Sequence, residues 1–257
     1  FLYSLLFIVV YLISLVVMLP ANYVVKQAKP HASQLVIDGV TGTLWSGEIE
    51  YLKADVVELT NVRWSLSPLA LLLGEAQLEF ISVSSEQSIE GTLELALWGD
   101  ELELSDLWIR FPISLYEQQL GLAGLDLTGQ IDFRLETINY QNGVVSNGLG
   151  VLVWRQAGIS ESLQLGDIQA DWQQLEGRVE AALSDLDGPV AIDGSVALDH
   201  SGEYQLATQL EVKDNSNVNL KQTIRLLLLE GGRSIGENSV QLERKGKVSM
   251  PPWLQLQ

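Results

Sequence analysis

Apolar and polar residues alternate along most of the chain after residue 30, and this alternation constrains the fold more than any other feature of the sequence. It is clearest at residues 93–98 (LELALW), 101–104 (ELEL) and 131–136 (IDFRLE). Successive side chains of a β-strand point to opposite faces of the sheet, so a period of two predicts strands with one apolar and one polar face. Weaker versions of the pattern occur at residues 151–153, 168–172, 190–192 and 206–212.

Pairs of turn-forming residues separate these runs. Short strands joined by such pairs predict an antiparallel sheet, because Asn-Gly, Asp-Gly and similar pairs suit tight hairpins. The pairs are Gly99-Asp100, Asn142-Gly143, Asn147-Gly148, Asp187-Gly188, Asp193-Gly194 and Ser201-Gly202.

Two short helices are expected among the strands. The first runs over residues 112–120, with a proline at its first position and a glycine after its end. The second runs over residues 218–230, with Ser216 or Asn217 as the N-cap and two glycines as the stop. Its apolar stripe is expected to pack in the core. The stripe consists of Leu220, Ile224, Leu227 and Leu228.

The first 19 residues (FLYSLLFIVVYLISLVVML) contain no charged side chain, and Pro20 follows them. A helix of this length covers about 28 Å, close to the roughly 30 Å hydrocarbon core of a bilayer. The stretch is longer than the apolar core of a signal peptide and lacks a convincing cleavage site. It therefore predicts an uncleaved transmembrane anchor over residues 1–25 and a β-rich domain over residues 26–257.

The charges of the chain help to predict on which side of the membrane this domain lies. Residues 31–257 carry 13 basic and 33 acidic side chains, and long domains cross a membrane largely regardless of local charge. Lys26 and Lys29 oppose this orientation under the positive-inside rule. We expect an anchor with its N-terminus inside and an exported C-terminal domain.

Composition and motifs exclude several classes of function. The chain has no Cys and two His, His31 and His200, which argues against disulfides, Cys/His zinc sites and thiol nucleophiles, and no metal or cofactor is expected. The net charge of −18 argues against binding to nucleic acid. Dinucleotide-binding and P-loop motifs are missing from the sequence, and no enzymatic activity is expected. Carboxylate pairs such as Glu101/Glu103 and Asp185/Asp187 are expected to keep a solvent-exposed face of the sheet hydrated.

The tryptophans indicate an internal repeat. Trp45 and Trp64 are 19 residues apart, and Trp154 and Trp172 are 18 apart. We infer two related halves, about 31–121 and 149–231, that form one curved sheet. These four rings are expected to be buried with hydrogen-bonded N–H groups.

Two other tryptophans are candidates for contact with a partner. Trp98 and Trp108 flank the acidic stretch 99–106.

The segment GTLWSG (42–47) has a glycine at each end, Gly42 and Gly47. Glycine allows a bulge or turn that a Cβ would obstruct, and the run between the two is expected to pair in the sheet. Trp45 should then be a packing anchor at the start of the sheet, with Trp154 in the equivalent place of the second half.

Several stretches resemble protein N of the bacterial type II secretion system. They are GVTGTLWSGEIEYL (39–52), NVRWSLSPLALLLGEAQLEF (61–80), TGQIDF (128–133), LGDIQADW (165–172), DLDGPVAIDGSVALDHSGEYQL (185–206) and LLLEGGRSIGENSVQLERKGKV (227–248). The resemblance implies a single-pass inner-membrane accessory without catalytic residues, whose periplasmic domain meets other subunits of a machine that exports folded proteins. The chain is also distantly similar to AsmA-like periplasmic proteins, whose sheets form apolar gutters associated with lipid.

Two functions therefore remain open. The first is an interaction subunit that contacts inner-membrane and periplasmic subunits through sheet edges or the region of Trp98 and Trp108. The second is a lipid-binding module in which apolar faces such as 93–97, 102–104 and 131–135 line a groove.

Overall fold

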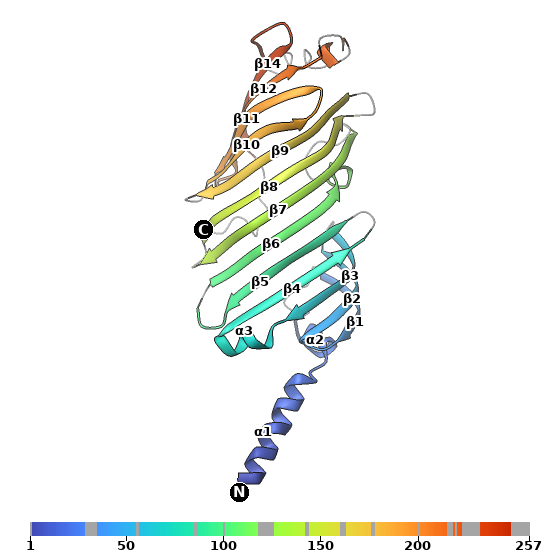
Figure 1. Ribbon diagram of the computed structural model, residues 1–257, viewed down its shortest axis with the longest axis vertical. Helices are drawn as coiled ribbons and strands as arrows, with labels where there is room; N and C mark the ends of the chain where they lie inside the picture. Colours follow the sequence, from blue (N-terminus) through green and yellow to red (C-terminus); the bar gives the residue numbers. More distant parts are fainter. Residues whose placement is uncertain are drawn as a thin grey trace. The chain divides into compact units, whose positions relative to one another are not determined.

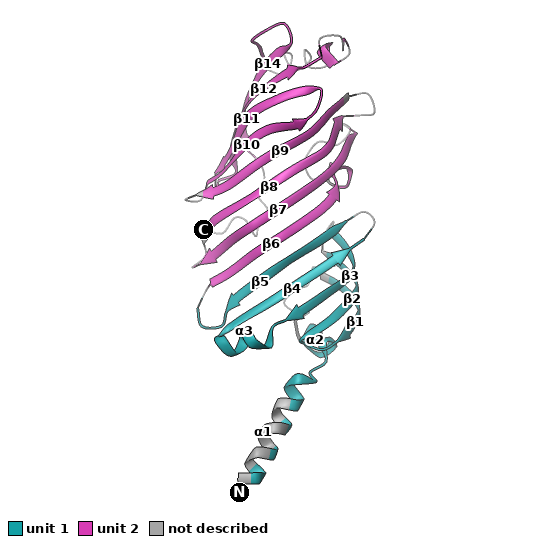
Figure 2. Ribbon diagram, viewed as in Figure 1, with its two compact units in different colours: residues 1–99 teal, residues 100–257 magenta. Residues whose placement is uncertain are grey.

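The computed structural model divides into two compact units, residues 1–99 and residues 100–257 (Figure 2). It describes residues 2–28, 35–54, 57–84, 87–99, 101–117, 126–141, 144–159, 163–175, 178–199, 201–214, 218, 220–222 and 232–247. The units do not coincide with the predicted halves, 31–121 and 149–231, whose relatedness stays a prediction.

Unit 1 contains five described strands, and each pairs antiparallel with the next along the chain (Figure 1). The strands are β1 (Leu35–Gly42), β2 (Ser46–Ala54), β3 (Val57–Leu66), β4 (Glu75–Val83) and β5 (Ser88–Ala96). The helices are α1 (Leu2–Val17), α2 (Ala21–Ala28) and α3 (Pro68–Leu73). Among the residues that the structure describes, no helix is both long and apolar enough for a membrane span.

Unit 2 contains nine described strands, again antiparallel and in chain order except that β14 lies between β12 and β13. They are β6 (Glu101–Pro112), β7 (Leu127–Gln141), β8 (Val144–Ile159), β9 (Leu163–Leu175), β10 (Arg178–Asp187), β11 (Val190–Asp199), β12 (Glu203–Val212), β13 (Arg233–Ser234) and β14 (Ser239–Lys247). A 3-10 helix, η2 (Ile113–Tyr116), follows β6. The mainly β, antiparallel fold expected from the period of two is confirmed.

The predicted turns have different outcomes. Asp187-Gly188 and Ser201-Gly202 lie where β10 meets β11 and β11 meets β12, as expected. Asn147-Gly148 and Asp193-Gly194 lie inside β8 and β11, so those two predictions are wrong. Gly194 is needed for close approach of strands, since a Cβ there would lie 2.7 Å from Thr208 of β12. Asn142-Gly143 and Asp100 lie outside the described residues.

The first predicted helix does not begin at Pro112, and its described part, η2, is a 3-10 helix. Pro112 is extended (φ −70°, ψ 132°) and pairs with Gln130, so it ends β6 and caps η2 instead of opening an α-helix. Residues 118–120 lie outside the described residues.

The second predicted helix is described only at residues 218 and 220–222, which are helical. Leu220 is buried with Val190, Val212 and Val240, which confirms core packing for that residue. Ile224, Leu227 and Leu228 lie outside the described residues. The sequence analysis missed α3, because its residues (PLALLL) have no polar face from which a helical period could be read.

Each unit's sheet has one apolar and one polar face. Residues directly paired across strands share a face, so the register sorts them. In unit 2 one cross-strand row reads Phe133, Leu152, Ala170 and Leu183, and the neighbouring row on the other face reads Arg134, Val151, Asp171, Ala182, Ser195, Ala207 and Glu243. In unit 1 one row reads Leu66, Leu78 and Leu93, and its neighbour on the other face reads Ser65, Glu79 and Thr92.

Candidate functional site

Two of the four tryptophans in the predicted repeat, which we call the motif tryptophans, lie across glycines of the neighbouring strand. The four are Trp45, Trp64, Trp154 and Trp172. Trp64 pairs with Gly47, and a Cβ at Gly47 would lie 2.4 Å from the Trp64 ring. Trp172 pairs with Gly150, and a Cβ there would lie 2.7 Å from its Nε1. An aromatic ring laid over a strand glycine covers backbone that the glycine leaves open. Both rings are half-buried, and the Trp172 ring also stacks on Phe133 at 5.8 Å.

Trp45 lies in the bend between β1 and β2 and not in a strand. The expectation that the run inside GTLWSG pairs in the sheet holds for Ser46, which pairs with Ser65 of β3. It is wrong for Leu44 and Trp45, which form the bend of a hairpin in which Gly42 and Gly47 pair with each other. Gly42 has φ +94°, which a residue with a Cβ rarely adopts. The half-buried Trp45 ring donates its Nε1–H to the carbonyl oxygen of Val16 at 3.0 Å, which ties the hairpin to the end of α1.

Trp154 lies within β8 and packs against Ile113, Leu127 and Ile131. Its Nε1–H donates to the carbonyl oxygen of Thr128 at 2.9 Å. It therefore resembles Trp45 in bonding a backbone carbonyl, although one ring sits in a hairpin bend and the other in a strand.

The indole N–H groups of Trp64 and Trp172 differ in their hydrogen bonding. Trp64 donates to the carbonyl oxygen of Leu44 at 3.2 Å. The buried Nε1 of Trp172 has no hydrogen-bond partner among the described residues, contrary to the expectation for that ring.

The two tryptophans considered for partner contact belong to different units. Trp98 follows β5 in unit 1 and is 88% exposed. Trp108 lies in β6 of unit 2, half-buried, with the guanidinium of Arg110 4.7 Å above its ring. A contact role for either ring stays a prediction.

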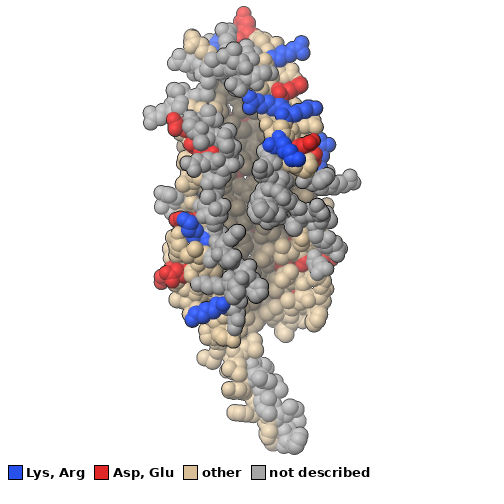
Figure 3. Space-filling view, turned by 180° about the vertical axis from the view of Figure 1, so that it is seen from behind, with Lys and Arg blue, Asp and Glu red and all other residues tan. Residues whose placement is uncertain are grey.

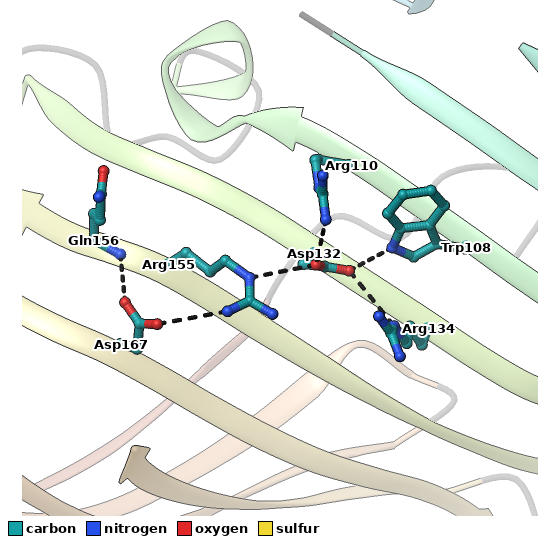
Figure 4. A network of polar contacts seen from close by, with 7 residues as sticks. All are labelled: Trp108, Arg110, Asp132, Arg134, Arg155, Gln156 and Asp167. Carbon is teal, nitrogen blue, oxygen red and sulfur yellow. Dashed lines mark hydrogen bonds and ion pairs between the residues drawn. The ribbon is translucent and has the colours of Figure 1, made fainter. Parts of the chain in front are cut away.

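A polar cluster on β6, β7 and β8 centres on Asp132, whose side chain is only 2% exposed (Figure 4). Trp108 Nε1 donates to Asp132 Oδ1 at 2.5 Å, and Arg110 Nη2 donates to Oδ2 at 3.0 Å. Arg155 Nε approaches Oδ2 at 3.4 Å, and Arg134 Nε lies 3.8 Å from Oδ1. Three guanidinium groups therefore converge on one buried carboxylate.

The surroundings lower the pKa of Asp132 below its ordinary value of 3.8. Burial by itself would raise the pKa, since it disfavours the charged form. The hydrogen bonds from Trp108 and Arg110, the charge of Arg110 and the bond from Arg155 together outweigh burial. Asp132 is therefore ionised at neutral pH, and its charge offsets part of the arginine charge.

The Arg cluster, which we define as Arg110, Arg134 and Arg155, extends to β9 through Asp167. Arg155 Nη1 lies 3.7 Å from Asp167 Oδ2, and Asp167 Oδ1 accepts the backbone N–H of Gln156 at 2.7 Å. The sequence analysis missed the cluster because Asp132 and its partners lie on three strands, and only the register places them together.

The polar face also carries a shallow groove of about 670 Å³ over β9 to β14. Its floor consists of small side chains of one cross-strand row, Ala182, Ser195 and Ala207. Charged side chains of both signs line it, and Figure 3 shows acidic and basic side chains intermingled towards this end of unit 2. The charged residues are Asp171, Arg178, Glu180, Glu243, Arg244 and Lys245.

Glu101, Glu103 and Asp185, three of the carboxylates considered from the sequence, have hydrogen-bond partners. Glu103 accepts a hydrogen bond from Thr137, and Glu101 accepts one from Gln141. Asp185 binds Lys213 Nζ and the backbone N–H of Ile192, and the Lys213 bond is the main cause of its lowered pKa. Within the described part of the chain, no group of three or more acidic or histidine side chains could hold a metal ion. His31 and His200 lie outside it.

Comparison with known proteins identifies relatives along most of the chain. Residues 33–233 match the family described as "Type II secretion system (T2SS), protein N". The type II secretion system protein N of Aeromonas hydrophila is 27% identical over 253 residues, covering 95% of this chain and 96% of that protein. The protein of the same name from Vibrio cholerae serotype O1 is 27% identical over 240 residues, covering 88% and 91%.

No solved structure shows significant similarity to the chain. The family match nevertheless covers β1 to β12 and the start of β13, and it includes the tryptophans and the Arg cluster described above. Glu243, Arg244 and Lys245 of the groove lie beyond it. This chain belongs to the type II secretion system protein N family.

Proposed function

We propose that the chain is an accessory subunit of the type II secretion system in the bacterial inner membrane, with residues 1–25 as its anchor and residues 26–257 in the periplasm. It acts without catalysis, through contacts with other inner-membrane and periplasmic subunits of the system. The observation that carries the proposal is the family match over residues 33–233.

Membrane anchoring is supported by the chemistry of the N-terminal segment. Residues 1–19 contain no charged side chain. Large apolar side chains on and just after α1, among them Phe7, Tyr11 and Met18, are more than half exposed. An uncharged helix with exposed apolar side chains is costly in water and favourable in lipid.

Protein contact is supported by the Arg cluster. The chain has a net charge of −18, yet the cluster places three guanidinium groups around one buried carboxylate. Arg134 is 68% exposed and reaches Asp132 only at 3.8 Å, so its donors can bind a partner's carboxylate. Arginine is enriched among the residues that contribute most of the binding energy of protein interfaces.

Secretion measured in a strain that lacks the gene and is complemented with variants tests this function. Arg134→Gln should lower the secreted fraction of a substrate protein while the amount of the subunit in the membrane stays unchanged. Arg178→Gln is the control, because Arg178 is also exposed in unit 2 but pairs only with Glu180 among the described ion pairs. Normal secretion in the strain without the gene would overturn the proposal.

The orientation has its own test. A reporter fused after residue 257 should be active only when exported, and activity of a reporter that works only in the cytoplasm would contradict a periplasmic domain.

A second candidate function, binding of lipid acyl chains, is favoured by the apolar face of unit 2. Phe133, Leu152 and Trp154 on that face are only half-buried. A groove lined by them could accept an acyl chain. Mass spectrometry of protein extracted in a mild detergent should then detect a lipid that copurifies in a defined ratio, and lipid-free protein that secretes normally would exclude this function.

A further inference from the structure

An exposed apolar patch lies at one end of unit 1. It consists of Leu69, Leu72 and Leu73 of α3 together with Trp98, and we refer to it as the α3 patch. Leu72 is 82% exposed and Trp98 is 88% exposed. Large exposed apolar patches mark binding sites for proteins, ligands or membranes.

Local interactions hold the patch in place. Ser67 Oγ accepts the backbone N–H of Ala70, and Pro68 occupies the first turn, so α3 begins at a defined residue. Gly74 ends α3 with φ +94°, and its carbonyl oxygen accepts the N–H of Leu97 at 2.9 Å. A Cβ at Gly74 would lie 3.1 Å from the Trp98 ring, so that ring sits beside the end of α3.

A short series of hydrogen bonds links the strand before α3 to the end of α1. Trp45 donates its Nε1–H to the carbonyl oxygen of Val16, and its own carbonyl oxygen accepts the N–H of Leu66 at 2.7 Å. Leu44 N donates to the carbonyl oxygen of Leu19 at 2.9 Å. Because α3 begins two residues after Leu66, it lies at the end of unit 1 from which α1 extends (Figure 1).

We propose that the α3 patch inserts into the boundary between headgroups and acyl chains of the bilayer, beside the point where α1 leaves it. The proposal rests on the membrane anchoring proposed above and adds a second membrane contact.

The chemistry of the segment favours lipid as the occupant. Residues 64–74 (WSLSPLALLLG) contain no charged side chain. Helices in the interface bury their apolar side chains about 5–10 Å below the headgroups, and tryptophan is enriched at that depth. Since α1 brings this end of unit 1 to the membrane surface, the leucines can enter the bilayer without any movement of the sheet.

Site-specific fluorescence can test the contact, because the chain has no cysteine to remove. Single-cysteine variants of the full chain, Tyr11→Cys, Leu72→Cys and Val83→Cys, would carry a polarity-sensitive label in vesicles of phosphatidylethanolamine and phosphatidylglycerol. All three positions are exposed. Val83 is the matched apolar control, since it ends β4, about 26 Å of strand away from α3.

We expect quenching by lipids that carry a nitroxide on the acyl chain. The label at residue 72 should be quenched at least about two-fold more than the label at residue 83, and most by a shallow nitroxide. The label at residue 11 should be quenched most by a deep nitroxide. Leu69→Ser and Leu73→Ser introduced together should reduce quenching at residue 72 and leave it unchanged at residue 11.

The outcomes separate the two proposals. An unquenched label at residue 11 would overturn the membrane anchor. Quenching at residue 11 with equal signals at residues 72 and 83 would overturn insertion of the α3 patch alone. The label at residue 72 could instead be shielded from water without being quenched by lipid, and become exposed on dilution to one chain per vesicle. That result would show that a second copy of the chain covers the patch, and it would also overturn insertion.

Discussion

Asp132 shows how much one residue of this sheet depends on its neighbours. We predict that Asp132→Asn lowers the free energy of unfolding by about 2–4 kcal/mol, because the three arginines keep their charge and lose the carboxylate that they surround. Urea unfolding of the detergent-solubilised chain, followed by tryptophan fluorescence, measures this change.

The control is Asp171→Asn on the same polar face. Asp171 is exposed and accepts hydrogen bonds from Gln169, so its replacement should change the free energy of unfolding by less than about 0.5 kcal/mol. Equal effects of the two substitutions would mean that the Arg cluster does not stabilise the fold.

The lowered pKa of Asp132 predicts a pH dependence with a definite sign. A carboxyl group whose pKa is lower in the folded state contributes stability above its unfolded pKa, and this is lost as the pH falls through the folded pKa. The stability difference between the natural chain and Asp132→Asn should therefore be constant near neutral pH and shrink below 3.8, the ordinary pKa.

Thermal unfolding of both proteins from about pH 6 to about pH 2.5 covers this range. Asp185 also has a lowered pKa and contributes in the same direction, but it remains in both proteins and cancels in the comparison. A difference that grows on acidification would contradict the assignment.

At the scale of elements, the β1–β2 hairpin is linked to α1 through Trp45. Trp45→Ala should lower the free energy of unfolding by about 2–3 kcal/mol, somewhat less than for a fully buried tryptophan, because both ring packing and the bond to Val16 are lost. Trp45→Phe keeps most of the ring and should cost about 1 kcal/mol.

Melting temperature, protein abundance and secretion should be measured together for both variants. We expect secretion to fall in proportion to the amount of folded protein. If Trp45→Ala abolished secretion while melting temperature and abundance stayed unchanged, the ring would have to contact a partner.

At the scale of the whole molecule, the strands pair almost entirely with their sequence neighbours in each unit. Such a sheet does not need the N-terminal segment to form. We predict that the chain without residues 1–19 remains β-rich by circular dichroism and no longer sediments with membranes. It should be less stable by about 1–2 kcal/mol, because the bonds to Val16 and Leu19 are missing. A spectrum dominated by helix would contradict this expectation.

Local signals in the sequence were sufficient for the strands and for several turns. The period of two in IDFRLE correctly separates Phe133 and Leu135 from Asp132 and Arg134, because side-chain direction in a strand depends only on position along it. The failures are at glycines such as Gly194 and at Pro112. Both residues lie within strands and contact a neighbouring strand. Turn propensity is a local property and does not take such contacts into account.

The sequence by itself determined the mainly β character, the apolar and polar faces, the uncharged first 19 residues and the resemblance to the protein N family, since each depends on local pattern. Only the tertiary structure decided the Arg cluster around Asp132, the glycines covered by Trp64 and Trp172, and the position of α3 beside the end of α1. Most of these contacts join residues that are 17 to 29 positions apart, and those within the sheets depend on strand register. A shift of register by one residue would place every side chain of a strand on the opposite face, so no local pattern contains this information.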